Sequence, residues 1–162
     1  MSFLISIITV NYNDAKGLEG TIKSVQNQTY TNCEHIIIDG GSTDRSKELI
    51  EKYKDSFSFW ISESDSGIYN AMNKGIAKAN GEYLLFLNSG DSLYSDTVLK
   101  DFIAFKPKED IVYGDSNITA PHKKDKLKIM PDNMEGTMIF YRTLNHQSIF
   151  HKRSLFEKYG NY

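Results

Sequence analysis

Apolar residues are grouped along the chain in five short runs, and a polar turn follows each of them. The runs cover residues 3–10, 34–39, 57–62, 83–87 and 111–113. The first two are dominated by isoleucine, and continuous β-branched runs are typical of strands buried on both faces of a parallel sheet. We therefore predict five strands.

The segments between these runs have the spacing of amphipathic helices. The repeating apolar positions are Leu18, Ile22 and Val25; Leu49, Ile50 and Tyr53; and Ile68, Met72, Ile76 and Ala79. Gly81 is expected to cap the third helix, and Pro107 to stop a fourth over residues 97–105. Strands that alternate with helices imply a mostly parallel sheet covered by helices on both faces.

The pattern is less regular after residue 113. Strands are predicted at 113–118 and 138–141, and a helix at 154–159. The basic run at 122–128 is typical of a solvated loop, and clustered lysines also suit peripheral contact with anionic lipid. No repeat or linker divides the 162 residues, so we predict a single domain.

Polar residues cluster at the carboxyl ends of the predicted strands. The acids among them are Asp39, Asp65, Asp91 and Asp115. In parallel sheets these ends meet at one edge, and ligands bind in the crevice beyond it. Gathered carboxylates repel one another unless a cation or a hydrogen-bond donor joins them. Because Mg²⁺ is often shared between carboxylates and substrate phosphates, the edge suits a nucleotide bound with a metal.

Composition narrows the function classes further. A net charge of -2 carries no strong field for nucleic acid, and 40% hydrophobic with 25% charged residues is ordinary for a soluble domain. Neither GxxxxGK[ST] nor GxGxxG occurs, so P-loop hydrolysis and dinucleotide binding are poorly supported. Cys33 is the single cysteine, which favours a reducing compartment, and we expect a cytoplasmic protein.

Several motifs in fixed order resemble the inverting family 2 glycosyltransferases, which have the GT-A fold. "ISIITVNYNDAKGLEGTIKSVQNQTYTNCEHIIIDGGSTDRS" resembles the N-terminal half of that family, and "SESDSGIYNAMNKGIAKANGEYLLFLNSGDSLYSD" its middle segment. "YGD" and "NHQSIF" match more loosely. The resemblance implies a three-layer α/β sandwich that transfers a sugar from a nucleotide-sugar, often a UDP-sugar. The acceptor would be a glycan or a lipid-linked saccharide of cell-surface polysaccharide synthesis.

The resemblance also implies roles for individual residues. Thr9 and Tyr12 would cradle the base, and Asp39 would bind the uracil and ribose region. The segment that carries Asp65, Asn73 and Lys74 would lie beside the nucleotide. The acidic loop that holds the ribose and the metal-diphosphate falls on Asn88, Ser89, Gly90 and Asp91.

Two departures from the family pattern matter. Asn88 and Gly90 stand where acids are usual, so Asp91 would hold Mn²⁺ or Mg²⁺ with the phosphates, helped by Asp115. We find no match for the base that accepts the acceptor's proton. Glu157 is expected on a surface helix. His146 is a weak candidate for the catalytic residue, through contact with the acceptor or the diphosphate. We therefore expect that residues 1–162 are truncated at the acceptor-binding end.

Structural alternatives accompany these roles. Thr9 has high strand propensity, Asp91 can cap a turn, and Asn73 with Lys74 can form a helix surface. The altered acidic loop and the missing base also suit a nucleotide-sugar binding module without turnover. A nucleotidyltransferase would need a glycine- and lysine-rich phosphate loop after the first strand, and "VNYNDAKG" is not that loop.

Overall fold

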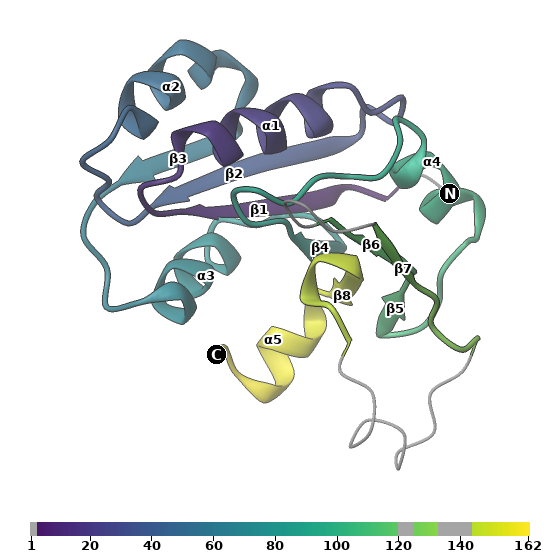
Figure 1. The fold of residues 1–162 in the computed structure, drawn as a ribbon. Helices are drawn as coiled ribbons and strands as arrows, with labels where there is room; N and C mark the ends of the chain where they lie inside the picture. Colours follow the sequence, from purple (N-terminus) through teal and green to yellow (C-terminus); the bar gives the residue numbers. More distant parts are fainter. Residues whose placement is uncertain (1–2, 120–124, 133–143) are drawn as a thin grey trace.

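The computed structural model describes residues 3–119, 125–132 and 144–162, which include a six-stranded sheet with helices on both faces (Figure 1). The strand order is β3-β2-β1-β4-β8-β5. These strands are β1 Ile5–Asn11, β2 Cys33–Asp39, β3 Phe59–Ser62, β4 Tyr83–Phe86, β5 Ile111–Tyr113 and β8 Ile149–Lys152. Because β1 pairs in parallel with β2 and β4, and β2 with β3, the predicted mostly parallel sheet is confirmed.

The helices form two outer layers around this sheet. They are α1 Ala15–Gln26, α2 Ser46–Tyr53, α3 Ile68–Ile76, α4 Val98–Ala104 and α5 Ser154–Tyr159. Ile8 faces the layer of α3, where Met72 packs, whereas Ile7 faces the opposite layer with Val25 of α1. Successive strand residues thus feed different layers, as the period of two requires, and the predicted three-layer α/β fold is observed (Figure 1). No helix of the described segments is both long enough and apolar enough to span a bilayer.

Strand β8 is not predicted by the sequence pattern. It inserts between β4 and β5 and is antiparallel to both. Its four residues, "IFHK", contain only two consecutive apolar positions, so no hydrophobic period marks the strand. Strand β5 therefore lies parallel to β4 but is separated from it by β8.

The structure corrects three other sequence predictions. The strand predicted at 113–118 is broken, and its second part pairs as β6 Ser116–Ile118 with β7 Lys126–Lys128. Residues 126–128 of the basic run are thus extended rather than a loop. Helix α3 ends at Ile76, and its C-cap is Ala77. Residues 120–124, 133–143 and the strand predicted at 138–141 lie outside the described residues.

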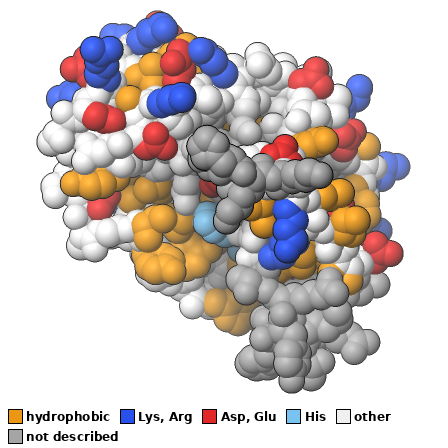
Figure 2. Space-filling view, viewed as in Figure 1, with side chains coloured by type: hydrophobic (Ala, Val, Ile, Leu, Met, Phe, Trp, Pro, Cys, Tyr) orange, Lys and Arg blue, Asp and Glu red, His pale blue; other side chains and the backbone are white. Residues whose placement is uncertain are grey.

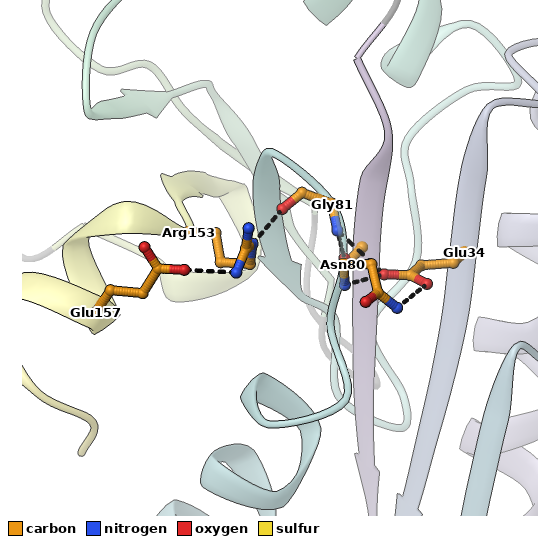
Figure 3. Close-up of polar contacts among 6 residues, drawn as sticks. Glu34, Asn80, Gly81, Arg153 and Glu157 are labelled. Atoms are coloured by element: carbon orange, nitrogen blue, oxygen red, sulfur yellow. Dashed lines mark hydrogen bonds and ion pairs between the residues drawn. The ribbon is translucent and has the colours of Figure 1, made fainter.

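Gly81 does not cap α3 as predicted, but allows the chain before β4 to pack closely against Ser6 of β1. A Cβ at this position would lie 2.5 Å from the backbone nitrogen of Ser6. The adjacent Glu34 carboxylate is buried and accepts hydrogen bonds from the Ser6 hydroxyl and the backbone nitrogen of Asn80, both at 2.6 Å. Arg153 Nε donates to the Gly81 carbonyl at 3.2 Å (Figure 3). These contacts fix the edge of the sheet where β4 begins.

We predict that Gly81→Ala lowers the free energy of unfolding by about 1–3 kcal/mol, because the new methyl group would displace the β1 backbone. Urea unfolding measures the change. Gly20→Ala is the matched control, since Gly20 lies within α1 and a methyl group added there would have no atom within 4 Å. This control should raise stability by up to about 1 kcal/mol. Equal urea midpoints for the two variants would contradict the close packing of Gly81.

Candidate functional site

Three neighbouring strands end at the same level of the sheet and bring their last polar residues together. Asn11 of β1 is in register with Asp39 of β2, and Asp39 with Ser62 of β3. The loop after β4, residues 88–91, reaches the same edge because Ser89 N donates to the Val10 carbonyl at 3.1 Å. This edge is the carboxyl end of the parallel strands, where α/β folds bind ligands.

The carboxylate of Asp39 organises this edge. Asn11 Nδ2 and Ser42 Oγ donate to its Oδ1 at 2.6 and 2.5 Å, while Ser62 Oγ and Ser42 N donate to its Oδ2 at 2.6 and 3.0 Å. Burial alone would raise the pKa of Asp39, but the hydrogen bonds outweigh it and the pKa is lowered. The side chain is thus ionised and 0% exposed. It orders the surrounding loops and presents no surface to a ligand in this conformation.

Tyr12 and Asp65 form an accessible pair beside Asp39. The Tyr12 side chain is 67% exposed. A Cβ added to Gly40 would lie 3.3 Å from the Tyr12 ring and 2.9 Å from Asp65 Oδ2, so the ring and the carboxylate meet across this glycine. Gly67 N donates to Asp65 Oδ1 at 2.9 Å and fixes the carboxylate. An aromatic face next to an acceptor suits a nucleobase and its ribose hydroxyls.

The 88–91 loop is held by residues that the sequence pattern does not single out. Thr21 of α1 donates from its hydroxyl to the Asp91 carbonyl at 2.7 Å and accepts from Gly90 N at 3.2 Å. Ser89 Oγ donates to Asn11 Oδ1 at 2.8 Å. Gly90 has a φ of +89°, which favours glycine and accounts for its place in the loop. No period or motif in the sequence identifies Thr21 as a loop contact.

Asn88, Asp91 and His146 lie close together at the tip of this loop. Asn88 Nδ2 is 3.1 Å from His146 Nε2, and Asn88 Oδ1 is buried with no hydrogen-bond partner in the structure. Burial raises the pKa of Asp91, and the nearby His146 opposes this rise. A cavity of about 510 Å³ also opens beside Asp91. Its lining residues are Asp14, Lys16, Gly17, Gly20, Thr21, Gly90, Asp91 and Ser92.

The donor set fits a divalent cation only in part. Asp91 supplies one carboxylate, and the partnerless Oδ1 of Asn88 is a further oxygen. Within the described ranges there is no group of three His, Cys, Asp or Glu residues that could hold a metal. Asp115 Oδ1 accepts from Met130 N at 2.8 Å, so Asp115 joins the turn after β5 to the segment after β7. Mg²⁺ and Mn²⁺ accept one or two carboxylates when phosphates and water complete the shell, so Asp91 with a bound diphosphate would suffice.

Thr9 is enclosed by other residues of the protein. Its side chain is fully buried, and its hydroxyl donates to the Leu87 carbonyl at 2.8 Å. The same oxygen lies 2.9 Å from His35 Nε2. Because the hydroxyl proton is directed at Leu87, His35 must carry its proton on Nε2 and donate it to Thr9. Thr9 therefore joins β1 to the segment before the 88–91 loop, and its hydroxyl is committed to protein partners.

Asn73 and Lys74 are engaged by protein groups. Asn73 Nδ2 donates to the Tyr162 carbonyl at 2.7 Å, and its Oδ1 accepts from Tyr162 N at 3.0 Å. Lys74 pairs with Glu63 at 2.8 Å. The surface around α3 and α5 is rich in hydrophobic side chains, whereas Lys and Arg gather over α2 (Figure 2). Tyr69 and Tyr162, both exposed, contact each other there with ring centroids 5.6 Å apart.

Comparison with known proteins yields a consistent result. The family model described as "Glycosyl transferase family 2" matches residues 6–157. An uncharacterized glycosyltransferase of Mycobacterium tuberculosis is 34% identical over 170 residues, covering 98% of this chain and 62% of that protein. The chain thus spans about 62% of the length of this curated relative.

Two solved structures have a similar fold. S. aureus TarS 1-349 in complex with UDP-GlcNAc matches with a TM-score of 0.76 and 22% identity, covering 95% of this chain and 46% of TarS. The mannosyltransferase PcManGT from Pyrobaculum calidifontis, in complex with GDP-Man and Mn²⁺, matches with a TM-score of 0.76 and 16% identity. This match covers 100% of this chain and 48% of PcManGT. These likenesses confirm the predicted GT-A fold.

Because His35 on β2 is buried, we predict that the stability of the fold decreases at low pH. Burial lowers the pKa of His35 to about 3 from 6.5. Its neutral form therefore stabilises the fold above pH 6.5, and this stability is lost as the pH falls toward about 3, by up to roughly 1.4 kcal/mol per pH unit. Urea unfolding across this range should show a smaller pH slope for His35→Gln. His146→Gln, which removes an exposed imidazole, is the matched control, and equal slopes for both variants would refute the assignment.

Proposed function

Since this chain belongs to glycosyl transferase family 2, we propose that it is the donor-binding part of an enzyme that uses a UDP-sugar. The observation that carries this proposal is the hydrogen-bonded edge of the sheet. There Asp39, Asn11 and Ser89 join the accessible Tyr12 and Asp65 to the loop that carries Asp91. TarS, of similar fold, was solved with UDP-GlcNAc, which supports a UDP-sugar as donor.

The nucleoside end of the donor is assigned to Tyr12 and Asp65. The exposed Tyr12 ring is available for stacking on the base, and Asp65 Oδ2 faces the same space across Gly40. Stacking on aromatic rings tolerates any base, so selection of uracil would fall to hydrogen-bonding groups of the adjacent loops. Asp39 contributes by holding Ser42 and Ser62 in place.

The diphosphate end is assigned to the 88–91 loop. A divalent cation held by Asp91, with Asn88 Oδ1 nearby, would offset the charge on the leaving diphosphate. PcManGT, also of this fold, was solved with Mn²⁺, which supports this use of a metal. His146 Nε2 accepts from Asn88 Nδ2, so the ring proton lies on Nδ1, and we assign this N–H to the diphosphate as a donor. We keep Ser89 as a structural support, because its hydroxyl is committed to Asn11.

The reaction we propose is inverting transfer to a hydroxyl of a glycan or lipid-linked acceptor, in cell-surface polysaccharide synthesis. Such a step needs a base for the hydroxyl proton. Glu157 is paired with Arg153, which binds Gly81 at the opposite edge of the sheet (Figure 3). Glu157 is thus unsuited to this role. We propose that the base comes from another part of the whole protein, and that residues 1–162 form its donor domain.

The acceptor would be met at the cytoplasmic face of a membrane. Leu127 and Ile129 are exposed beside Lys126 on and next to β7, a combination that suits an anionic lipid surface. The alternative is a nucleotide-sugar binding module without turnover. Sugar transfer or donor hydrolysis by the whole protein, against donor binding alone, separates the two proposals.

We predict that Tyr12→Ala weakens UDP binding about tenfold, since loss of a base-stacking ring costs roughly 1–3 kcal/mol. Isothermal titration with UDP in excess Mn²⁺ measures this loss. Tyr159→Ala is the matched control, because Tyr159 is 72% exposed and lies on α5. Unchanged affinity in Tyr12→Ala, with wild-type binding present, would remove Tyr12 from the site. No binding of UDP or GDP by the folded wild-type chain would refute the donor-site proposal itself.

We also predict that EDTA weakens UDP binding by the wild type and that Asp91→Asn abolishes this metal dependence. Neutralising the one carboxylate of the loop removes the main attraction for the cation, and the expected loss is about tenfold or more. Asp115→Asn is the control and should retain the metal dependence, because the cation is assigned to Asp91. The variant should also keep the local structure, since an asparagine still accepts the bond from Met130 N. If EDTA leaves the affinity of the wild type for UDP unchanged, the proposal that a metal binds at Asp91 is wrong.

A further inference from the structure

We propose that Asn11 is a positioning residue that couples the nucleoside end of the donor site to its diphosphate end. This inference rests on the proposed function and adds a residue to which neither the motifs nor the comparisons give a role. Asn11 is the last residue of β1, and its side chain is 1% exposed. It is therefore placed to act through other residues and not by touching the donor.

The contacts of Asn11 reach both ends of the site. Its Nδ2 donates to Asp39 Oδ1 at 2.6 Å, and its Oδ1 accepts from Ser89 Oγ at 2.8 Å. Strand β1 lies between β2 and β4 in the sheet. One amide group thus connects the carboxylate that orders the nucleoside loops with the loop assigned to the diphosphate.

The chemistry of the two partners fixes the direction of the amide. Asp39 has a lowered pKa and is ionised, so it can only accept and must face the Asn11 NH₂ group. The Asn11 carbonyl then faces Ser89, which donates. Ser42 Oγ lies 3.1 Å from the same Nδ2 and strengthens this orientation. An aspartate at position 11 would set a second carboxylate against Asp39, and an alanine would leave both partners without their bond.

Burial makes this connection stiff. The bond from Asn11 to the Asp39 carboxylate is buried and charge-assisted, whereas the bond from Ser89 to Asn11 joins neutral groups and is part-buried. Loss of either bond leaves a polar group of Asn11 enclosed without its partner. A shift of the 88–91 loop on binding a diphosphate would therefore move the Asn11 amide and change its hydrogen bond to Asp39. Ser42 and Ser62, which also donate to Asp39, would shift with it. The expected consequence is that the gain in affinity from uridine to UDP depends on Asn11.

The test compares the affinities of uridine and UDP for the wild type, Asn11→Ala and Ser62→Ala. Ser62→Ala is the matched control, because Ser62 also donates to Asp39 but lies on β3, separated from β1 by β2. It should weaken uridine and UDP by the same factor. Asn11→Ala should reduce the ratio of UDP to uridine affinity by about three- to tenfold. Equal ratios in the two variants would overturn the coupling.

Ser89→Ala supplies a second readout if Asn11→Ala fails to fold. It removes the bond to Asn11 and leaves the bond from Asn11 to Asp39 in place. Coupling predicts that this variant binds uridine more weakly, by about threefold, although Ser89 belongs to the diphosphate end. Unchanged uridine affinity would overturn the proposal. If the folded wild type binds neither ligand, the proposed function fails first, and that result differs from binding with unaltered ratios.

Discussion

The buried carboxylate of Asp39 imposes the main constraint on the carboxyl edge of the parallel sheet. A charge removed from water must be compensated by donors, and Asp39 receives four hydrogen bonds from Asn11, Ser42 and Ser62. These donors come from β1, the loop after β2, and β3, so satisfying one charge aligns three segments. Asn13 extends the arrangement, because its backbone nitrogen donates to Ser42 Oγ and its side chain accepts from Thr43 N. The loops are thereby held in one arrangement before any ligand arrives.

A buried carboxylate surrounded by hydrogen-bond donors lies at each end of the parallel strands: Glu34 at the amino ends and Asp39 at the carboxyl ends. At the amino end of β4, Glu34 is buried and compensated by Ser6, Asn80 and Gly81, and Arg153 attaches α5 to the same turn. The hydrogen bonds of these groups all join one part of the protein to another. At the carboxyl end, by contrast, the buried Asp39 is surrounded by side chains that stay accessible, such as the exposed Tyr12. A sheet stiffened at its amino edge can carry loops of changing composition at the other edge without loss of the fold.

Much of the fold follows from the sequence because burial on both faces leaves a strong signal. The isoleucines of β1 and β2 mark central parallel strands directly. Strand β8 gives no such signal, since only two of its four residues are apolar and its partners are distant in sequence. The sequence prediction for Gly81 is wrong for a related reason: glycine marks both helix ends and close backbone approaches, and only the position of Ser6 distinguishes them.

The site is harder to predict because a polar residue at a strand end can either meet the ligand or support a residue that does. The rule that ligands bind at the carboxyl edge places Asp39, Asp65 and Asp91 correctly at that edge. It does not separate the enclosed Asp39 from the accessible Asp65, and it overlooks Asn11 and Thr21, whose roles depend on which loop lies opposite. The acidic loop illustrates the same point. With asparagine and glycine at two of its positions, charge alone no longer defines the loop, and its geometry depends on hydrogen bonds from neighbouring elements. A metal held by Asp91 alone would therefore rely on the bound diphosphate to complete its coordination, so metal and donor should bind together and not in sequence.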